Sequence, residues 1–164
     1  MKKVDYLILL STETGEGQEV SKGDIIEQHT NSPSMGGFGW KRPGIDYLVA
    51  ADGSLETIIP EESPNVVDLW GIGEGQKGMT GIPKYLAYVG GKTTKGTKDK
   101  DTRTDEQKDT LAAVVKFYVR KFPNVQVLGF NQVPAKEGVT TPAFDVAEWC
   151  KEIGVPEENI FKGV

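Results

Sequence analysis

The sequence predicts an α/β domain in which a mixed central β-sheet is flanked by helices. Residues 6–10 form an uninterrupted apolar segment, which is typical of a central strand buried on both faces. Residues 46–50 and 55–59 are two further strand-like segments, and the Asp-Gly turn between them predicts a hairpin. Thr104-Asp105-Glu106-Gln107 caps a long helix, in which apolar residues recur at helical spacing and which ends before Pro123. Strands that alternate with helices in this way predict a layered α/β fold.

The remaining segments complete this pattern. A Ser or Asp cap near residue 21 opens a short helix that contains His29, and strands are expected at residues 85–89 and 125–128. A last helix is expected over residues 144–150, ending near Gly154. Loops are expected at residues 31–39 and 90–100, and an irregular segment that lies on the core at residues 61–81.

Length and charge limit the classes of function. The 164 residues fit a single domain spanning 1–164, and the net charge of −5 with a pI near 5.0 argues against general attraction to nucleic acid or to an anionic membrane. No apolar stretch reaches the roughly 20 residues that cross a bilayer, and the early apolar run is too short for a signal peptide. A soluble protein is expected. Its one cysteine, Cys150, excludes an intrachain disulfide.

Short motifs in the chain favour ordinary structural roles. Residues 90–93 read GGKT, like the end of a phosphate-binding loop, but Leu86 stands where the first glycine belongs. His29 has no second histidine or cysteine at ligand spacing and is expected to be a partly buried helix residue. Cys150 beside Trp149 is expected to be a small core residue, since no neighbouring base or cation cluster would lower its pKa.

Two larger groups of residues admit both a functional and a structural interpretation. A carboxylate metal site is conceivable near the start of the long helix, but negative charge is favoured there in any case; the residues are Asp101, Asp105, Glu106 and Asp109. The three tryptophans could line a sugar-binding cleft, and core packing or burial against a protein partner is at least as consistent with each; they are Trp40, Trp70 and Trp149.

Four segments in order resemble the zinc-dependent N-acetylmuramoyl-L-alanine amidases, a family that includes phage amidase lysozymes and peptidoglycan recognition proteins. They are GWKRPGIDYLVAADGSLE (39–56), YLAYVGGKTTKGTKDKDTRTDEQK (85–108), FPNVQVLGF (122–130) and TPAFDVAEW (141–149). The resemblance runs from about residue 6 to about residue 149. It implies an amidase-like fold, with a hairpin entering the active site and a central strand followed by a capped helix.

The resemblance also implies that the zinc site is lost. In this family two histidines and a cysteine or aspartate hold zinc, and a metal-bound water attacks the amide between muramic acid and L-alanine. The first histidine falls on Ser11, the second on Phe130 and the cysteine on Thr141. The assisting tyrosine and lysine fall on Ile45 and Val139. Without zinc, which lowers the pKa of bound water from about 15.7 to about 7, almost no hydroxide is available. The apolar replacements predict a cleft that is packed shut.

These inferences lead to three functional hypotheses. The first is a catalytically inactive amidase-fold protein, not an enzyme and without a cofactor, that contacts other protein subunits in a larger assembly such as the tail or portal region of a bacteriophage particle. The second is a non-catalytic protein that binds peptidoglycan. The third is an amidase with an atypical site that uses Asp46 or Glu13 beside Thr141. Partners among nucleic acids or membranes are not expected, and the location is expected to be a phage particle or the bacterial cytoplasm.

Overall fold

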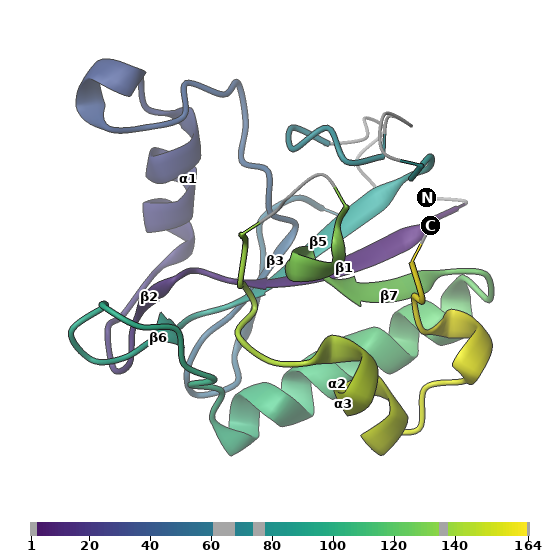
Figure 1. Cartoon of the computed structure of the whole chain (residues 1–164). Helices are drawn as coiled ribbons and strands as arrows, with labels where there is room; N and C mark the ends of the chain where they lie inside the picture. The colour runs from purple at the N-terminus through teal and green to yellow at the C-terminus, as the bar shows by residue number, and fades with distance from the viewer. Residues whose placement is uncertain (1–2, 61–67, 74–77, 135–137, 164) are drawn as a thin grey trace.

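A mixed β-sheet organises the computed structural model, which describes residues 3–60, 68–73, 78–134 and 138–163 (Figure 1). The described strands of this sheet run in the order β4-β3-β5-β1-β7. All neighbours are parallel except the β3–β4 pair, which is antiparallel. The bounds are β1 Tyr6–Ser11, β3 Tyr47–Val49, β4 Leu55–Thr57, β5 Pro83–Tyr88 and β7 Gln126–Gly129. The predicted mixed sheet with flanking helices is confirmed.

Strand β1 lies inside the sheet and is buried on both faces, as its apolar sequence predicts. It pairs with β5 on one side and β7 on the other. Because side chains alternate along a strand, Leu7 and Leu9 face one hydrophobic core while Ile8 and Leu10 face the other. The strand therefore separates two apolar layers that are built on opposite faces of one sheet.

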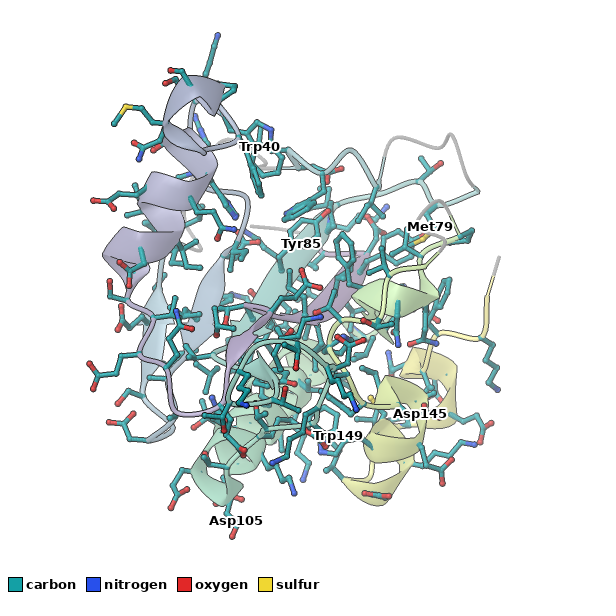
Figure 2. The ribbon with its side chains drawn as sticks, turned by 60° about the vertical axis from the view of Figure 1, so that its left-hand side comes forward. Trp40, Met79, Tyr85, Asp105, Asp145 and Trp149 are labelled. Atoms are coloured by element: carbon teal, nitrogen blue, oxygen red, sulfur yellow. The ribbon has the colours of Figure 1, made fainter. Side chains whose placement is uncertain are left out.

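Helices α2 (Asp105–Lys121) and α3 (Val146–Glu152) cover one face of the sheet. Thr104 caps α2 through a reciprocal pair of hydrogen bonds with Gln107, the capping box that the sequence predicts. On the other face lies the shorter helix α1 (Lys22–Thr30), which Ser21 caps in the same way (Figure 1). In Figure 2, Trp40 and Tyr85 lie on the α1 side of the sheet, and Trp149 lies on the α2 side.

Local structure departs from the sequence prediction most clearly after strand β5. The expected loop at residues 90–100 begins with a short strand, β6 (Gly91–Lys92), that pairs in parallel with β2 (Thr14–Gly15). Short 3-10 helices occupy Pro33–Met35, Phe130–Gln132 and Glu157–Asn159. Much of the predicted irregular segment at 61–81 lies outside the described residues. No described helix has both the length and the apolar character that a bilayer crossing requires.

Candidate functional site

A cavity of about 530 Å³ opens at the carboxyl ends of the central strands. Strand β1 ends at Ser11, and Phe130 directly follows the neighbouring parallel strand β7, so both residues reach the same edge of the sheet. The carboxyl edge of a parallel sheet is a common place for ligand sites in α/β folds. Helix α1 supplies the opposite wall with Ile25, Gln28 and His29.

All five positions that the sequence analysis assigned to the lost active site line this one cavity. Ser11, Phe130 and Thr141 stand where zinc ligands are expected, and Ile45 and Val139 stand where the assisting residues are expected. These residues come from four separate parts of the chain, since Val139 and Thr141 belong to one segment. The prediction that the cleft is packed shut is wrong, because the replacements Phe130, Ile45 and Val139 line the space without filling it.

The donor chemistry at these positions does not fit a zinc ion. Ser11 and Thr141 are joined by a hydroxyl–hydroxyl hydrogen bond of 3.0 Å, and the Ser11 backbone N–H donates to Thr141 Oγ1 at 2.7 Å. Neutral hydroxyls and hydrocarbon side chains are not the thiolate, imidazole and carboxylate ligands that zinc takes in proteins. Across the described residues, no group of three or more His, Cys, Asp or Glu side chains is arranged to hold a metal ion.

The single histidine is a structural residue of the cavity wall. His29 is buried, and its Nδ1 accepts a hydrogen bond of 2.9 Å from the Gly44 backbone N–H. Burial lowers the pKa of His29 to about 4, because the charged imidazolium would lose its hydration. The ring is therefore neutral at neutral pH. The prediction of a buried helix histidine is confirmed.

An aromatic cluster surrounds His29 and supports the cavity. Its ring stacks on Phe38 at 5.1 Å and meets Trp40 and Trp70 edge-on at 5.1 and 6.0 Å. Trp70 continues the cluster to Phe130, with ring centroids 5.1 Å apart. Such edge-to-face contacts stabilise beyond the area that they bury. The cluster therefore joins α1 to the strand end that carries Phe130.

Gly44 links the cluster to the backbone. Its N–H donates to His29, and its carbonyl accepts a 3.0 Å hydrogen bond from Trp70 Nε1. A Cβ at this position would lie 2.8 Å from the Trp40 ring, so a larger residue would push the cluster apart. The position immediately precedes Ile45 in the cavity wall, and the backbone there is thus held from both sides.

Comparisons with known proteins agree with this geometry. No family model matches the sequence, and no curated protein matches it either. Solved structures do match. The N-acetylmuramoyl-L-alanine amidase LysC from Clostridium intestinale aligns with a TM-score of 0.63 at 15% identity, over 94% of this chain and 87% of that one.

Peptidoglycan recognition proteins match equally well. The drosophila protein PGRP-SD aligns with a TM-score of 0.66 at 11% identity, over 99% of this chain and 86% of that one. Human PGRP-IβC in complex with glycosamyl muramyl pentapeptide aligns with a TM-score of 0.59 at 14% identity, over 97% and 86%. The chain has the fold of the amidases and peptidoglycan recognition proteins. At these identities the likeness concerns the amidase fold and not the chemistry of the site.

Three charged residues of this chain line the mouth of the 530 Å³ cavity. Lys92 and Asp99 form an ion pair of 2.5 Å there, and Glu13 lines the same space. The hydrogen bond to Asp99 raises the pKa of Lys92, and the same bond lowers the pKa of Asp99. Glu13 has a φ of 55°, which is uncommon for a residue with a side chain. Sequence reasoning considered Lys92 only as part of a phosphate-loop pattern and did not connect it with this mouth.

The third hypothesis for the site does not hold for Asp46. This carboxylate is buried, lies 3.2 Å from Lys84 Nζ and accepts a 2.8 Å hydrogen bond from the Tyr85 backbone N–H. It is not among the cavity residues that include Glu13 and Thr141. Asp46 is thus held as half of a buried ion pair, where removing one partner would leave an uncompensated charge.

The other residues singled out from sequence have structural positions. Cys150 is fully buried, and burial raises its pKa to about 12, so it is a core thiol as predicted. Trp149 packs on Phe144, whose ring also carries the Arg103 guanidinium at 3.4 Å. Arg103 in turn pairs with Asp101 at 2.8 Å. Asp105 and Glu106 occupy the first turn of α2.

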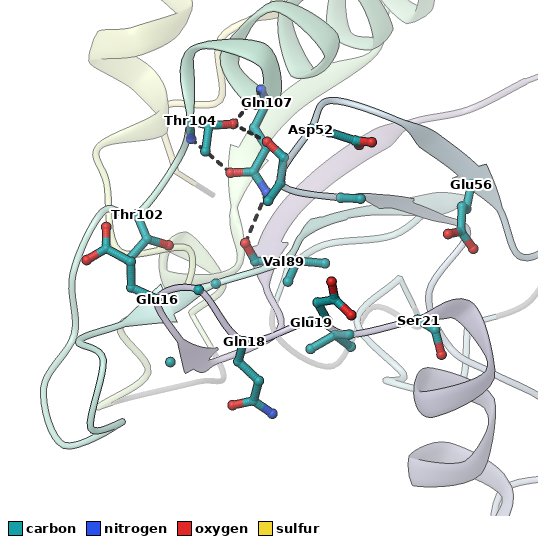
Figure 3. Close-up of a pocket in the computed structure, with 16 residues that line it drawn as sticks. Glu16, Gln18, Glu19, Ser21, Asp52, Glu56, Val89, Thr102, Thr104 and Gln107 are labelled. Atoms are coloured by element: carbon teal, nitrogen blue, oxygen red, sulfur yellow. Dashed lines mark hydrogen bonds between the residues drawn. The ribbon is translucent and has the colours of Figure 1, made fainter.

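A second cavity, of about 600 Å³, lies beside the start of α2 (Figure 3). Gln107 forms part of its wall and donates to the carbonyls of Val49 and Val89, which ties α2 to the ends of β3 and β5. Four carboxylates line this second cavity, those of Glu16, Glu19, Asp52 and Glu56. So many carboxylates disfavour an anionic ligand in this cavity.

Proposed function

We propose that this chain is a catalytically inactive protein with the amidase fold, which acts by binding a ligand rather than by hydrolysis. The supporting observation is the composition of the 530 Å³ cavity. The five residues at the positions assigned from the amidase resemblance lie on its wall. They offer hydroxyl and hydrocarbon groups in place of zinc ligands and assisting residues. The space that a substrate would occupy persists while the groups that would activate water are replaced.

The hydroxyls of the cavity are not arranged as activated nucleophiles. Ser11 Oγ and Thr141 Oγ1 hydrogen-bond to each other, and each also accepts from a backbone N–H, that of Glu13 and that of Ser11 respectively. An activated nucleophile needs a base within hydrogen-bond reach. Among the described residues, neither hydroxyl has such a base as a hydrogen-bond partner. These contacts fit a role in shaping the wall.

The ligand class that this cavity fits best is a peptidoglycan fragment. Its volume lies in the usual range of small-molecule sites, and its wall combines aromatic surface from Trp70 and Phe38 with polar groups at the mouth. One structural neighbour was solved with a glycosamyl muramyl pentapeptide. We infer that a muramyl peptide lies in the corresponding cavity here and leaves it uncleaved.

Calorimetry with muramyl peptides, together with a peptidoglycan-release assay, tests this proposal. We expect binding heat and no release of peptide. Val139→Phe would place a ring in the cavity without changing charge, and it should weaken binding tenfold or more, since steric exclusion removes most of the contact. The matched control is Val20→Phe, the same replacement in the wall of the second cavity, of about 600 Å³, which should leave the affinity unchanged.

Two outcomes would contradict the proposal. Cleavage of peptidoglycan by the purified protein, lost on Val139→Phe, would make it an enzyme with an atypical site. Absence of binding heat with every muramyl peptide would remove the peptidoglycan ligand.

A second candidate function is that of a structural subunit of a bacteriophage particle, in which the fold serves as an interaction module. The observation that favours it is an exposed apolar groove between β4 and α2, away from the cavity. Large exposed apolar patches mark contact surfaces. We expect its gene to lie beside capsid and tail genes, and the protein to be found by mass spectrometry in purified particles.

A further inference from the structure

The groove between β4 and α2 has a volume of about 440 Å³. Leu55 of β4 and the α2 residues Ala113 and Phe117 belong to its wall, and Asp109 is the one charged residue of that wall. Strand β4 is the edge strand on this side of the described sheet. The groove therefore combines an apolar floor with the border of the sheet.

Two large apolar side chains at this groove face solvent. Leu55 is 44% exposed and Phe117 is 49% exposed, whereas Leu111, Val114, Val115 and Tyr118 of α2 are buried. Each exposed aromatic or aliphatic side chain of this size leaves a favourable burial unmade. A partner that covered both would gain that burial.

The outward face of α2 has an ordered distribution of charge. Glu106, Asp109, Ala113, Phe117 and Arg120 are all exposed, and at about 100° per residue they fall within roughly 40° of the direction of Ala113. The acidic residues lie on the N-terminal side of Ala113 and the arginine lies on the C-terminal side. Ala113, the smallest of the five, stands at the centre, where a second helix could approach closely.

This distribution is complementary to itself when two helices run antiparallel. Glu106 and Arg120 lie seven residues on either side of Ala113. A twofold axis near Ala113 would bring Glu106 of each copy to Arg120 of the other, and Phe117 of each copy over the groove of the other. A parallel arrangement would place like charges together, which disfavours association. Twofold pairing is also the commonest symmetry among homo-oligomers.

We propose that two copies of this chain associate through this face as a twofold-symmetric dimer, with α2 antiparallel across the axis and Phe117 of each copy seated in the groove of the other. This inference goes beyond the proposed ligand binding, because it uses a different surface from the cavity. Ala113 and Phe117 form the centre of the contact, Asp109 borders the groove that receives the partner's ring, and Glu106 and Arg120 lie at the ends.

Sedimentation velocity over a concentration series tests the dimer. We expect the wild-type chain to shift from monomer to dimer as concentration rises. Phe117→Arg should lower the association constant about tenfold or more, since it removes a central aromatic and sets two positive charges in apolar grooves. Circular dichroism checks that each variant is folded.

A charge swap tests the register. Glu106→Arg and Arg120→Glu should each weaken the dimer, because each opposes like charges across the axis. The double variant Glu106→Arg/Arg120→Glu should restore it, since both cross-axis pairs are again opposite in sign. The matched control is Lys108→Glu, which makes the same charge change as Arg120→Glu at an exposed α2 position about 140° from Ala113.

Three results would overturn the dimer. They are a wild-type chain that stays monomeric up to about 1 mM, a double variant no better than its single parents, and a Lys108→Glu effect as large as that of Arg120→Glu. None of the substituted residues lines the 530 Å³ cavity, so the muramyl peptide titration can succeed or fail independently of this outcome.

Discussion

The two faces of the sheet differ in how completely their side chains fill the available space. Under α2 and α3, Leu111, Val115 and Val127 are fully excluded from solvent. On the α1 face, a cavity of about 530 Å³ remains between Ile45, Phe130 and their neighbours. The comparison teaches that fully buried side chains under α2 and α3 can hold the sheet together while side chains on the α1 face border an open space.

The largest expected effect contrasts the two faces directly. Leu111→Ala should lower the free energy of unfolding by about 3 kcal/mol, because it opens a hole among fully buried side chains. Val139→Ala should cost about 1 kcal/mol or less, since this side chain already borders open space. Urea unfolding of both variants provides the measurement, and equal losses would refute the difference between the faces.

The next prediction places zinc ligands at the three positions where the resemblance expects them. In the variant Ser11→His/Phe130→His/Thr141→Cys, zinc at one hundred times its dissociation constant should stabilise the fold by about 2.7 kcal/mol through mass action. Zinc should leave the wild-type chain unchanged. Thermal unfolding with and without zinc is the measurement, with equilibrium dialysis as a direct count of bound metal.

A matched control retains the two new histidines and replaces Thr141 by Ala, so it lacks the thiolate. It should bind zinc more weakly than the full variant. A folded triple variant that takes up no zinc would contradict the assignment of these three positions to the zinc-ligand positions of the resembled family.

The buried histidine makes the cavity face sensitive to acid. The pKa of His29 is about 4 in the folded protein and near its ordinary 6.5 when unfolded, so the unfolded chain binds the extra proton between these values. Stability should therefore be full above about pH 6.5 and fall as the pH drops toward 4. The contribution between pH 7 and pH 5 is about 2 kcal/mol.

Urea unfolding of the wild type and of His29→Gln between pH 7 and pH 5 isolates this contribution, because carboxylates titrate in both proteins. The variant should be less stable at pH 7 and should lose less stability on acidification. Equal pH slopes would show that His29 keeps an ordinary pKa.

The smallest expected effect concerns the hydroxyl pair. Thr141→Val keeps the shape of the side chain but removes the acceptor for the Ser11 backbone N–H and for its hydroxyl. An unsatisfied buried donor should lower the free energy of unfolding by about 1 to 2 kcal/mol. Thr140→Val, at the adjacent exposed position of the cavity wall, serves as the control and should change stability by less than about 0.5 kcal/mol.

Local sequence signals predicted most of the framework. The capping sequences at Ser21 and Thr104 and the Asp-Gly turn act over a few residues, so each could be read without knowledge of the rest of the chain. The pairing of β2 with β6 was missed because two-residue strands have no periodicity to detect. The site positions followed from the resemblance, and the structure brings all five of them to one cavity.

Contacts between residues that are far apart in the sequence could not be predicted from local sequence signals. The contact of Gly44 with His29 and Trp70, the Lys92–Asp99 pair at the mouth and the Asp46–Lys84 pair depend on how the chain returns on itself. Two tryptophans offered a weak signal for the aromatic cluster, but nothing in their spacing indicated that they meet His29.

By itself, the sequence determined the order of the main-sheet strands and of the α-helices. It also determined that a chain with one histidine lacks the pair of imidazoles on which the resembled zinc site depends. Only the tertiary structure decided that the cavity stays open, and that Leu55 and the outward face of α2 share one groove. The physical reason is that element type follows from interactions within a few residues, whereas a cavity is the space left over when side chains from separate segments are packed against one another.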